Sequence, residues 1–144
     1  IDNVNHRWQD VARTDVVQYI GSISENEKQE LLARASLLLF PSLWEGFGLV
    51  TLEAMALSKP IIASKVSALP EIIVDGETGF LIPPANSAAL ADSILTLLHD
   101  PEKAKAIGLS GRARLDKEFT VQRMARQHVA VYREAASRVP EFRA

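Results

Sequence analysis

The chain has 144 residues, a formal net charge of −2 and no cysteine. This length fits one domain with a sizeable buried core, and the weak negative charge leaves no broad basic field to attract nucleic acid. Without cysteine there are no disulfides and no thiolate metal ligands. We therefore expect a globular protein of a reducing, cytoplasmic compartment without a nucleic-acid partner.

The hydropathy pattern gives no candidate membrane span or signal peptide. The longest uncharged run, from Ala35 to Trp44, is well short of the roughly 20 apolar residues that cross a bilayer. The chain begins at Ile1 without an initiator Met, and residues 1–15 are polar and poorly patterned. We interpret the sequence as a piece of a longer protein.

The first patterned segments are a strand and a helix. Residues 16–20, "VVQYI", are β-branched and aromatic and stop at a glycine, which predicts a short strand. The next segment, "SENEKQELLARA", has the Ser24–Glu27 spacing of a capping box followed by an apolar helix face.

The middle of the chain alternates strands and helices. Short apolar runs predict buried strands at 36–40 and 60–64, the first of them closed by a proline, and a short strand at 78–83. Helical patterns lie between them, at 48–57 and as a turn at 69–74.

The tail predicts three helices. The first follows a cap at Asn86 or Ser87, the second opens at Pro101, and the third starts after Thr120. We see no internal repeat or low-complexity linker.

Apolar strands that alternate with helices predict a doubly wound, Rossmann-like α/β fold, with a parallel sheet covered on both faces. Only about four strands are visible where a full fold of this type has about six, so we expect its start to be missing. We predict one partial domain, 1–144. Within it, residues 1–15 form an ill-defined start, 16–100 the α/β core and 101–138 the carboxyl-terminal helices.

The loop 41–47 is the predicted ligand site, because ligands of open α/β sheets bind beyond the carboxyl ends of the strands. Gly46 and Gly48 allow the backbone to turn sharply and approach a ligand. The backbone N–H groups of residues 47–50, at a helix N-terminus, could then serve phosphate or sugar oxygens.

Two carboxylates flank this loop, Glu45 before the helix and Glu53 in its second turn. A carboxylate can accept hydrogen bonds from two neighbouring hydroxyls, so the pair suits a sugar–diphosphate–nucleoside, which has hydroxyls on both sides of its phosphates. The spacing alone is equally compatible with an alternative in which neither residue binds a ligand. In that alternative, the charge of Glu45 stabilises the helix N-terminus and Glu53 is a solvated helix residue.

The stretch "FPSLWEGFGLVTLEAMALSKPIIAS" resembles the donor-site signature of retaining GT-B glycosyltransferases, in particular glycosyltransferase family 4. The segments "YIGSISENEKQELLARASLLLF" and "LPEIIVDGETGFLIPPANSAALADSILTLLHDP" resemble the neighbouring parts of the same carboxyl-terminal lobe. The resemblance covers about residues 15–135.

The resemblance implies a nucleotide-diphosphate sugar as donor substrate and transfer of its glycosyl group with retention of anomeric configuration. Glu45, at the catalytic position, would bind the donor sugar. The other donor-binding residues would be Gly46, Phe47, Gly48, Leu49, Val50 and Glu53, with Glu53 holding the ribose. The resemblance implies no metal and no other cofactor, and we find no Asp-x-Asp motif.

The sequence departs from the family at several points. Ser58 stands where a glycine is usual after the helix, and Ser67-Ala68 stands where Gly-Gly is common near the donor. The family's diphosphate-binding Arg and Lys, and the acceptor-binding N-terminal lobe with its His, would lie upstream. We therefore expect no transferase activity from this chain alone.

The acceptor stays open between a sugar, a lipid-linked sugar and a small molecule. Peripheral membrane association of the longer protein also stays open, since family members often work at membranes. The alternative functions are a non-catalytic nucleotide-sugar-binding module and a protein-interaction module.

Most of the remaining polar residues are interpreted as structural or surface residues without a role in a site. His6, His99 and His128 are interpreted as packing or surface residues, and Lys65 as a solvated loop lysine. Glu71 is open between structure and function, and Trp44 either walls the donor pocket or packs beneath it. A basic set in the tail is interpreted as a solvated helical face: Arg112, Arg114, Lys117, Arg123 and Arg126.

Overall fold

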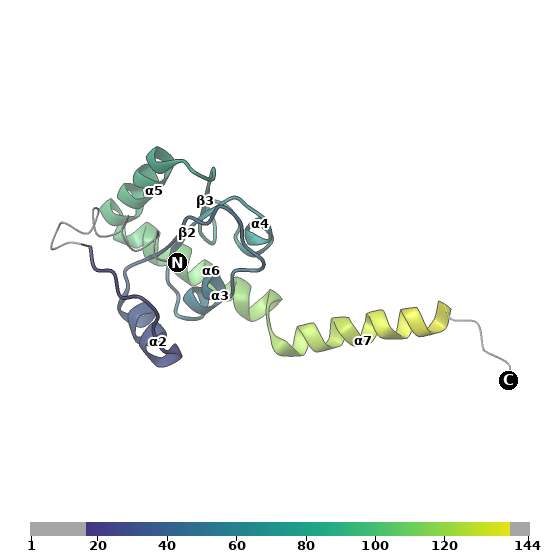
Figure 1. Cartoon of the computed structure of the whole chain (residues 1–144). Helices are drawn as coiled ribbons and strands as arrows, with labels where there is room; N and C mark the ends of the chain where they lie inside the picture. Colours follow the sequence, from purple (N-terminus) through teal and green to yellow (C-terminus); the bar gives the residue numbers. More distant parts are fainter. Residues whose placement is uncertain (1–16, 139–144) are drawn as a thin grey trace, which may run out of the picture. The chain divides into compact units, whose positions relative to one another are not determined.

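The computed structural model describes residues 17–138 (Figure 1). Its internal contacts divide the chain into two compact units, Ile1–Leu31 and Leu32–Ala144. Helix α2, Glu25–Arg34, runs across the boundary, and the other helices and strands of residues 17–138 lie in the second unit.

The predicted capping box at the start of α2 is confirmed. The Ser24 backbone N–H donates to Glu27 Oε2 at 2.8 Å, and the Glu27 N–H donates to Ser24 Oγ at 3.3 Å. The Ser24 hydroxyl also donates to Glu27 Oε2 at 2.7 Å. These bonds satisfy N–H groups that a helix start leaves without intrahelical partners.

The prediction of a strand at 16–20 is wrong for residues 17–20, the part that the structure describes. Residues 17–20 are not part of the sheet, and Val17, Tyr19 and Ile20 are exposed. β-branched and aromatic residues favour an extended chain, but a strand forms only where a neighbouring strand completes the ladder. Residue 16 lies outside the described residues.

The sheet of the described residues has three strands: β1 Leu38–Phe40, β2 Ile61–Ser64 and β3 Phe80–Ile82. All pair in parallel in the order β1-β2-β3, with Leu39 opposite Ile62 and Ala63 opposite Leu81. The three middle strands of the prediction are confirmed, each beginning one or two residues later than expected.

After β1, the described residues form five helices: α3 Leu49–Ala56, α4 Leu69–Ile72, α5 Ser87–His99, α6 Pro101–Glu118 and α7 Val121–Arg138 (Figure 1). Asn86 caps α5, accepting the Ala89 N–H at 2.9 Å, and Pro101 is the first residue of α6. The predicted cap and proline start are therefore confirmed.

The core lies on both faces of the sheet, as a doubly wound fold requires. Side chains of a strand alternate between its faces. Ile61 and Ala63 pack in one cluster with Met55 of α3 and with Leu69 and Ile72 of α4. Ile62 packs in the other cluster, with Leu97 of α5 and Ile107 of α6. All four residues of β2 are buried, so this strand is the centre of the fold.

Helix α6 fits closely against the end of α3 because two of its residues lack side chains. A Cβ added at Gly108 would lie 2.1 Å from the Ser58 carbonyl oxygen, and one at Gly111 would lie 3.3 Å from Met55 Cγ. Ser58 itself has a positive φ of 53°, so the expected left-handed turn is present with serine in place of glycine.

We expect Gly108→Ala to destabilise the protein. Alanine favours a helix interior, but its methyl group would meet a backbone oxygen that no rotamer change can move away. The free energy of unfolding should fall by about 1–3 kcal/mol, as in other overpacked sites. Urea denaturation measures it. Ser110→Ala, on an exposed residue of the same helix, should change the free energy by less than about 0.5 kcal/mol. A Gly108→Ala protein as stable as the wild type would contradict the packing.

The capping box also predicts a titration effect. The Ser24 side chain, followed by the Ser24 backbone N–H, lowers the pKa of Glu27 below its ordinary value of 4.5. A carboxyl whose pKa is lowered by folding stabilises α2 above its unfolded pKa, and this contribution is lost as the pH falls through the folded pKa. Ser24→Ala should return the Glu27 pKa toward 4.5, as followed by carboxyl NMR shifts. Ser22→Ala should leave the pKa unchanged, and an equal rise in both variants would argue against the box.

Candidate functional site

The predicted site loop lies at the carboxyl edge of the sheet. It follows β1 directly and leads into α3. Since all three strands are parallel, the segments after β2 and β3 leave the sheet at this same edge. Residues 41–48 therefore occupy the position where an open α/β sheet receives its ligand.

Gly48 is the hinge between loop and helix. Its φ of 83° and ψ of 48° are left-handed, and it is the N-cap of α3. A Cβ there would lie 2.7 Å from Leu69 Cδ2, so α4 packs closely against this glycine. Thr51 holds the Gly48 carbonyl twice, through its N–H at 2.9 Å and its hydroxyl at 2.7 Å.

The start of α3 keeps its backbone donors available. The cap residue is a glycine, so no side chain caps the helix. Within residues 17–138, the N–H groups of Phe47, Gly48, Leu49 and Val50 donate to no acceptor. Together with the partial positive charge of a helix N-terminus, these donors suit an anionic oxygen.

Glu45 is half-buried and folded back on its own loop. Its Oε1 accepts the Gly46 N–H at 2.9 Å, while its backbone N–H donates to Ser67 Oγ at 3.4 Å. Ser67 precedes α4 and has a left-handed φ of 48°, at the place where the resemblance leads one to expect Gly-Gly. The serine keeps the left-handed turn and adds a hydroxyl that contacts the site loop.

Glu53 lies in the second turn of α3, as predicted. The residue is half-buried, and its Oε2 is buried. Leu49 is 65% exposed and Val50 half-buried on the preceding turn. The structure thus places the predicted carboxylates at opposite ends of one loop–helix segment, with the free backbone donors between them.

A cavity of about 530 Å³ adjoins the loop. Phe47 and Leu49 are the predicted site residues that line it, and the remaining apolar lining comes from Leu52 and from Phe119, Val121 and Met124 around the α6–α7 junction. Glu45, Gly46, Gly48, Val50 and Glu53 do not line this cavity. This cavity therefore shares Phe47 and Leu49 with the candidate donor site.

Large apolar side chains on the site loop face outward. Leu43 is 73% and Trp44 78% exposed. This exposure excludes the interpretation that Trp44 packs beneath the site. Lys65 is an exposed residue, as expected, whose backbone N–H donates to the Ile82 carbonyl at 2.7 Å.

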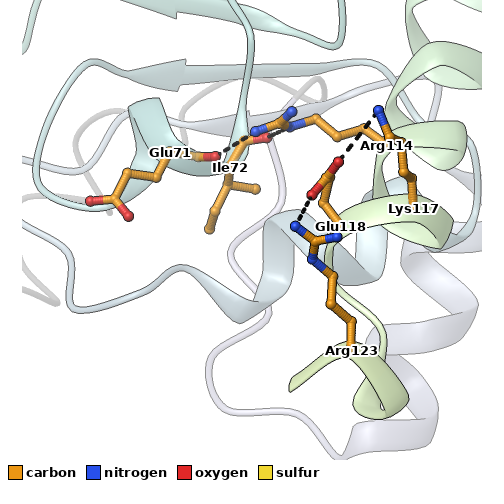
Figure 2. A network of polar contacts seen from close by, with 6 residues as sticks. All are labelled: Glu71, Ile72, Arg114, Lys117, Glu118 and Arg123. Atoms are coloured by element: carbon orange, nitrogen blue, oxygen red, sulfur yellow. Dashed lines mark hydrogen bonds and ion pairs between the residues drawn. The ribbon is translucent and has the colours of Figure 1, made fainter. Parts of the chain in front are cut away.

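A polar network lies beside the cavity and corrects the interpretation of the basic tail (Figure 2). Arg114 is half-buried and donates to the backbone carbonyls of Glu71 and Ile72, both at 2.7 Å. Arg112 donates to the Ala56 carbonyl at 2.6 Å. These two residues are structural, because each satisfies carbonyls at the end of a helix. In Figure 2 the Glu71 carboxylate points away from Arg114.

Ser67, Leu69, Thr51 and Arg114 support the site and were not among the predicted site residues. A departure from the Gly-Gly pattern drew attention to Ser67, and the positive charge of Arg114 was visible only as part of a basic helix. Thr51 bonds to a residue three positions before it, whereas the roles of Ser67, Leu69 and Arg114 depend on contacts between segments more than 20 residues apart, which no local pattern reveals.

The histidines of the described residues are surface residues, and the same residues contain no candidate metal site or membrane span. His99 and His128 are exposed, as expected for surface residues, and His6 lies outside the described residues. Over residues 17–138, no three side chains of His, Cys, Asp or Glu gather in a way that could hold a metal ion. In the same part of the chain, no helix is both long enough and apolar enough to cross a membrane.

The sheet, its ligand-facing edge and the glycine-started helix define a Rossmann-like α/β domain. The chain belongs to the glycosyl transferases group 1 family, whose family model matches residues 3–114. Solved structures that share its fold are GT-B glycosyltransferases.

Two curated relatives illustrate the similarity. One is the MMP alpha-(1->4)-mannosyltransferase of Mycolicibacterium hassiacum, 41% identical over 127 residues, covering 88% of this chain and 31% of the relative. The other is the alpha-maltose-1-phosphate synthase of Mycolicibacterium smegmatis, 34% identical over 132 residues, covering 88% of this chain and 34% of the relative. The chain thus spans about a third of the relatives that it matches.

Two solved structures share the fold. The sucrose-phosphate synthase of Thermosynechococcus elongatus has a TM-score of 0.83 at 33% identity, covering 96% of this chain and 35% of that one. HepE of Anabaena, in complex with UDP-glucose, has a TM-score of 0.82 at 28% identity, covering 92% of this chain and 37% of that one.

The two glycines of the loop should respond differently to alanine. Gly48→Ala places a Cβ in a left-handed conformation and against Leu69, so the free energy of unfolding should fall by about 1–2 kcal/mol. Gly46→Ala meets no atom within 4 Å and should change it by less than about 0.5 kcal/mol. Urea unfolding of both variants measures the difference. Equal effects would mean that the conformation and packing of Gly48 do not require a glycine.

Proposed function

We propose that this chain is the donor-binding lobe of a retaining, metal-independent glycosyltransferase. The observation that carries the proposal is the start of α3, where Gly48 takes a left-handed conformation that leaves the N–H groups of residues 47–50 available. A nucleotide-diphosphate sugar is the ligand whose charge and shape fit this edge. Because the chain spans about a third of its relatives, we propose that it binds donor and that turnover needs the rest of a longer protein.

Each site residue has a role in this proposal. The N–H groups of Leu49 and Val50 receive the diphosphate at the helix N-terminus, where the helix dipole favours negative charge. Those of Phe47 and Gly48 face sugar hydroxyls. Glu53, one turn further along α3, accepts hydrogen bonds from the ribose hydroxyls.

Glu45 is the catalytic-position residue at the sugar end. In the free chain its carboxylate already accepts one backbone N–H, from Gly46. A carboxylate has acceptor capacity for further donors, so it can also receive a sugar hydroxyl. Gly46 contributes by allowing this tight local turn.

Glycosyl transfer would be accelerated by the placement of the backbone N–H groups. As the glycosidic bond breaks, negative charge grows on the departing diphosphate, and fixed N–H groups aimed at it stabilise the transition state. HepE in complex with UDP-glucose supports a nucleotide-sugar donor. The names of the mycobacterial relatives refer to alpha linkages, which an alpha-linked donor yields when its configuration is retained.

A calorimetric titration with UDP-, GDP- and ADP-glucose tests the proposal. We expect one of the three nucleotide sugars to bind. Glu53→Ala should lower its affinity by more than about tenfold, or 1.4 kcal/mol, because the ribose hydroxyls lose their hydrogen-bond acceptor. Glu77→Ala removes an exposed carboxylate from a turn outside the site and should leave the affinity unchanged.

The titration can also contradict the proposal. A folded chain that binds none of the three donors would show that this lobe does not form a donor site by itself. Equal weakening by Glu53→Ala and Glu77→Ala would indicate a general electrostatic effect in place of a ribose contact.

A further inference from the structure

The short helix α4 supports the site loop at two points. Ser67, just before α4, accepts the Glu45 N–H at 3.4 Å. Leu69, the first residue of α4, is fully buried against Gly48, where a Cβ would approach it to 2.7 Å. The position of α4 therefore determines the position of residues 45–48, which form the sugar end of the proposed donor site.

A helix of four residues has few hydrogen bonds of its own to hold it in place. The Ile73 N–H donates to the Leu69 carbonyl at 2.9 Å, but the carbonyls of Glu71 and Ile72 are left for partners outside α4. Arg114 of α6 supplies these partners. Its Nε donates to the Ile72 carbonyl and its Nη2 to the Glu71 carbonyl, both at 2.7 Å (Figure 2).

Arg114 is itself firmly placed. The residue is half-buried, and its guanidinium carbon lies 5.6 Å from the centre of the Phe119 ring. The nearby carboxylate of Glu118 pairs with Arg123 at 2.8 Å and with Lys117 at 3.5 Å (Figure 2). The guanidinium of Arg114 is thus directed to the two carbonyls, and charge-assisted bonds of this kind are stronger than neutral ones.

We propose that Arg114 is a positioning residue that fixes the sugar end of the donor site through α4. The inference rests on the proposed function for its ligand, but its structural part can be tested without any ligand. The diphosphate and ribose contacts lie on α3, which α6 holds separately through Gly108 and through the bond from Arg112 to the Ala56 carbonyl. Loss of Arg114 should therefore affect the sugar more than the nucleotide.

The first experiment measures backbone ¹⁵N order parameters of the free chain. In the wild type, residues 45–48 should be rigid, at about 0.85, and in Arg114→Met they should fall toward 0.6 or below. Residues of β2 should not change. Arg112→Met is the matched control, because it removes an arginine–carbonyl bond from the same helix without touching α4. It should leave residues 45–48 rigid.

The second experiment compares UDP-glucose with UDP by calorimetry. Arg114→Met should lower the affinity for UDP-glucose by about tenfold and the affinity for UDP by less than about threefold. Arg112→Met should lower the affinities for both ligands by the same factor. Arg114→Lys keeps the charge but lacks the planar pair of donors, so it should restore the order parameters and the affinity only in part.

The outcomes separate the two proposals. If the wild type binds neither ligand, the proposed function fails, and the order parameters alone decide the positioning role. Residues 45–48 that are already mobile in the wild type, or unchanged in Arg114→Met, overturn the inference, as does an equal loss of affinity for UDP-glucose and UDP. If Arg114→Met is unfolded by circular dichroism, Arg114→Lys is judged by the same criteria.

Discussion

The left-handed conformation of Gly48 is the constraint on which the site depends. A residue with a side chain would be strained there and would collide with Leu69. Because Gly48 has no side chain, it starts α3 without capping it, and the N–H groups of residues 47–50 stay available to a ligand. The same left-handed geometry that requires a glycine thus leaves free the N–H donors of the proposed diphosphate site.

The support for this loop comes from a helix far along the chain. α6 reaches α3 through Gly108 and Arg112, and reaches α4 through Arg114. These contacts join segments more than 40 residues apart in the sequence. A rigid helix that holds both sides of the loop suits a site whose backbone donors must face charge that develops during a reaction.

Local patterns predicted the parts of this structure that local forces determine. The capping box at Ser24, the cap at Asn86 and the buried strand around Ile62 follow from short-range chemistry and apolar runs, and they were predicted correctly. The residues 17–20 read as a strand and are not one, because strand formation needs a neighbour that a single run cannot reveal. The roles of Ser67 and Arg114 were likewise hidden, since the partners of both lie in other segments. The loop between β1 and α3 was located correctly because its glycines, its helix start and its family resemblance all fall within one short stretch, while its role as a donor site stays a prediction.

An amide NMR titration of the chain with UDP-glucose tests most directly whether the start of α3 binds a nucleotide sugar. The largest shift changes should fall on Phe47, Gly48, Leu49 and Val50, whose N–H groups have no acceptor within the described chain. Smaller changes should extend to Glu45 and Glu53. Changes that gather on a different face of the sheet, or none at millimolar UDP-glucose, would contradict the claim that the start of α3 is a nucleotide-sugar site.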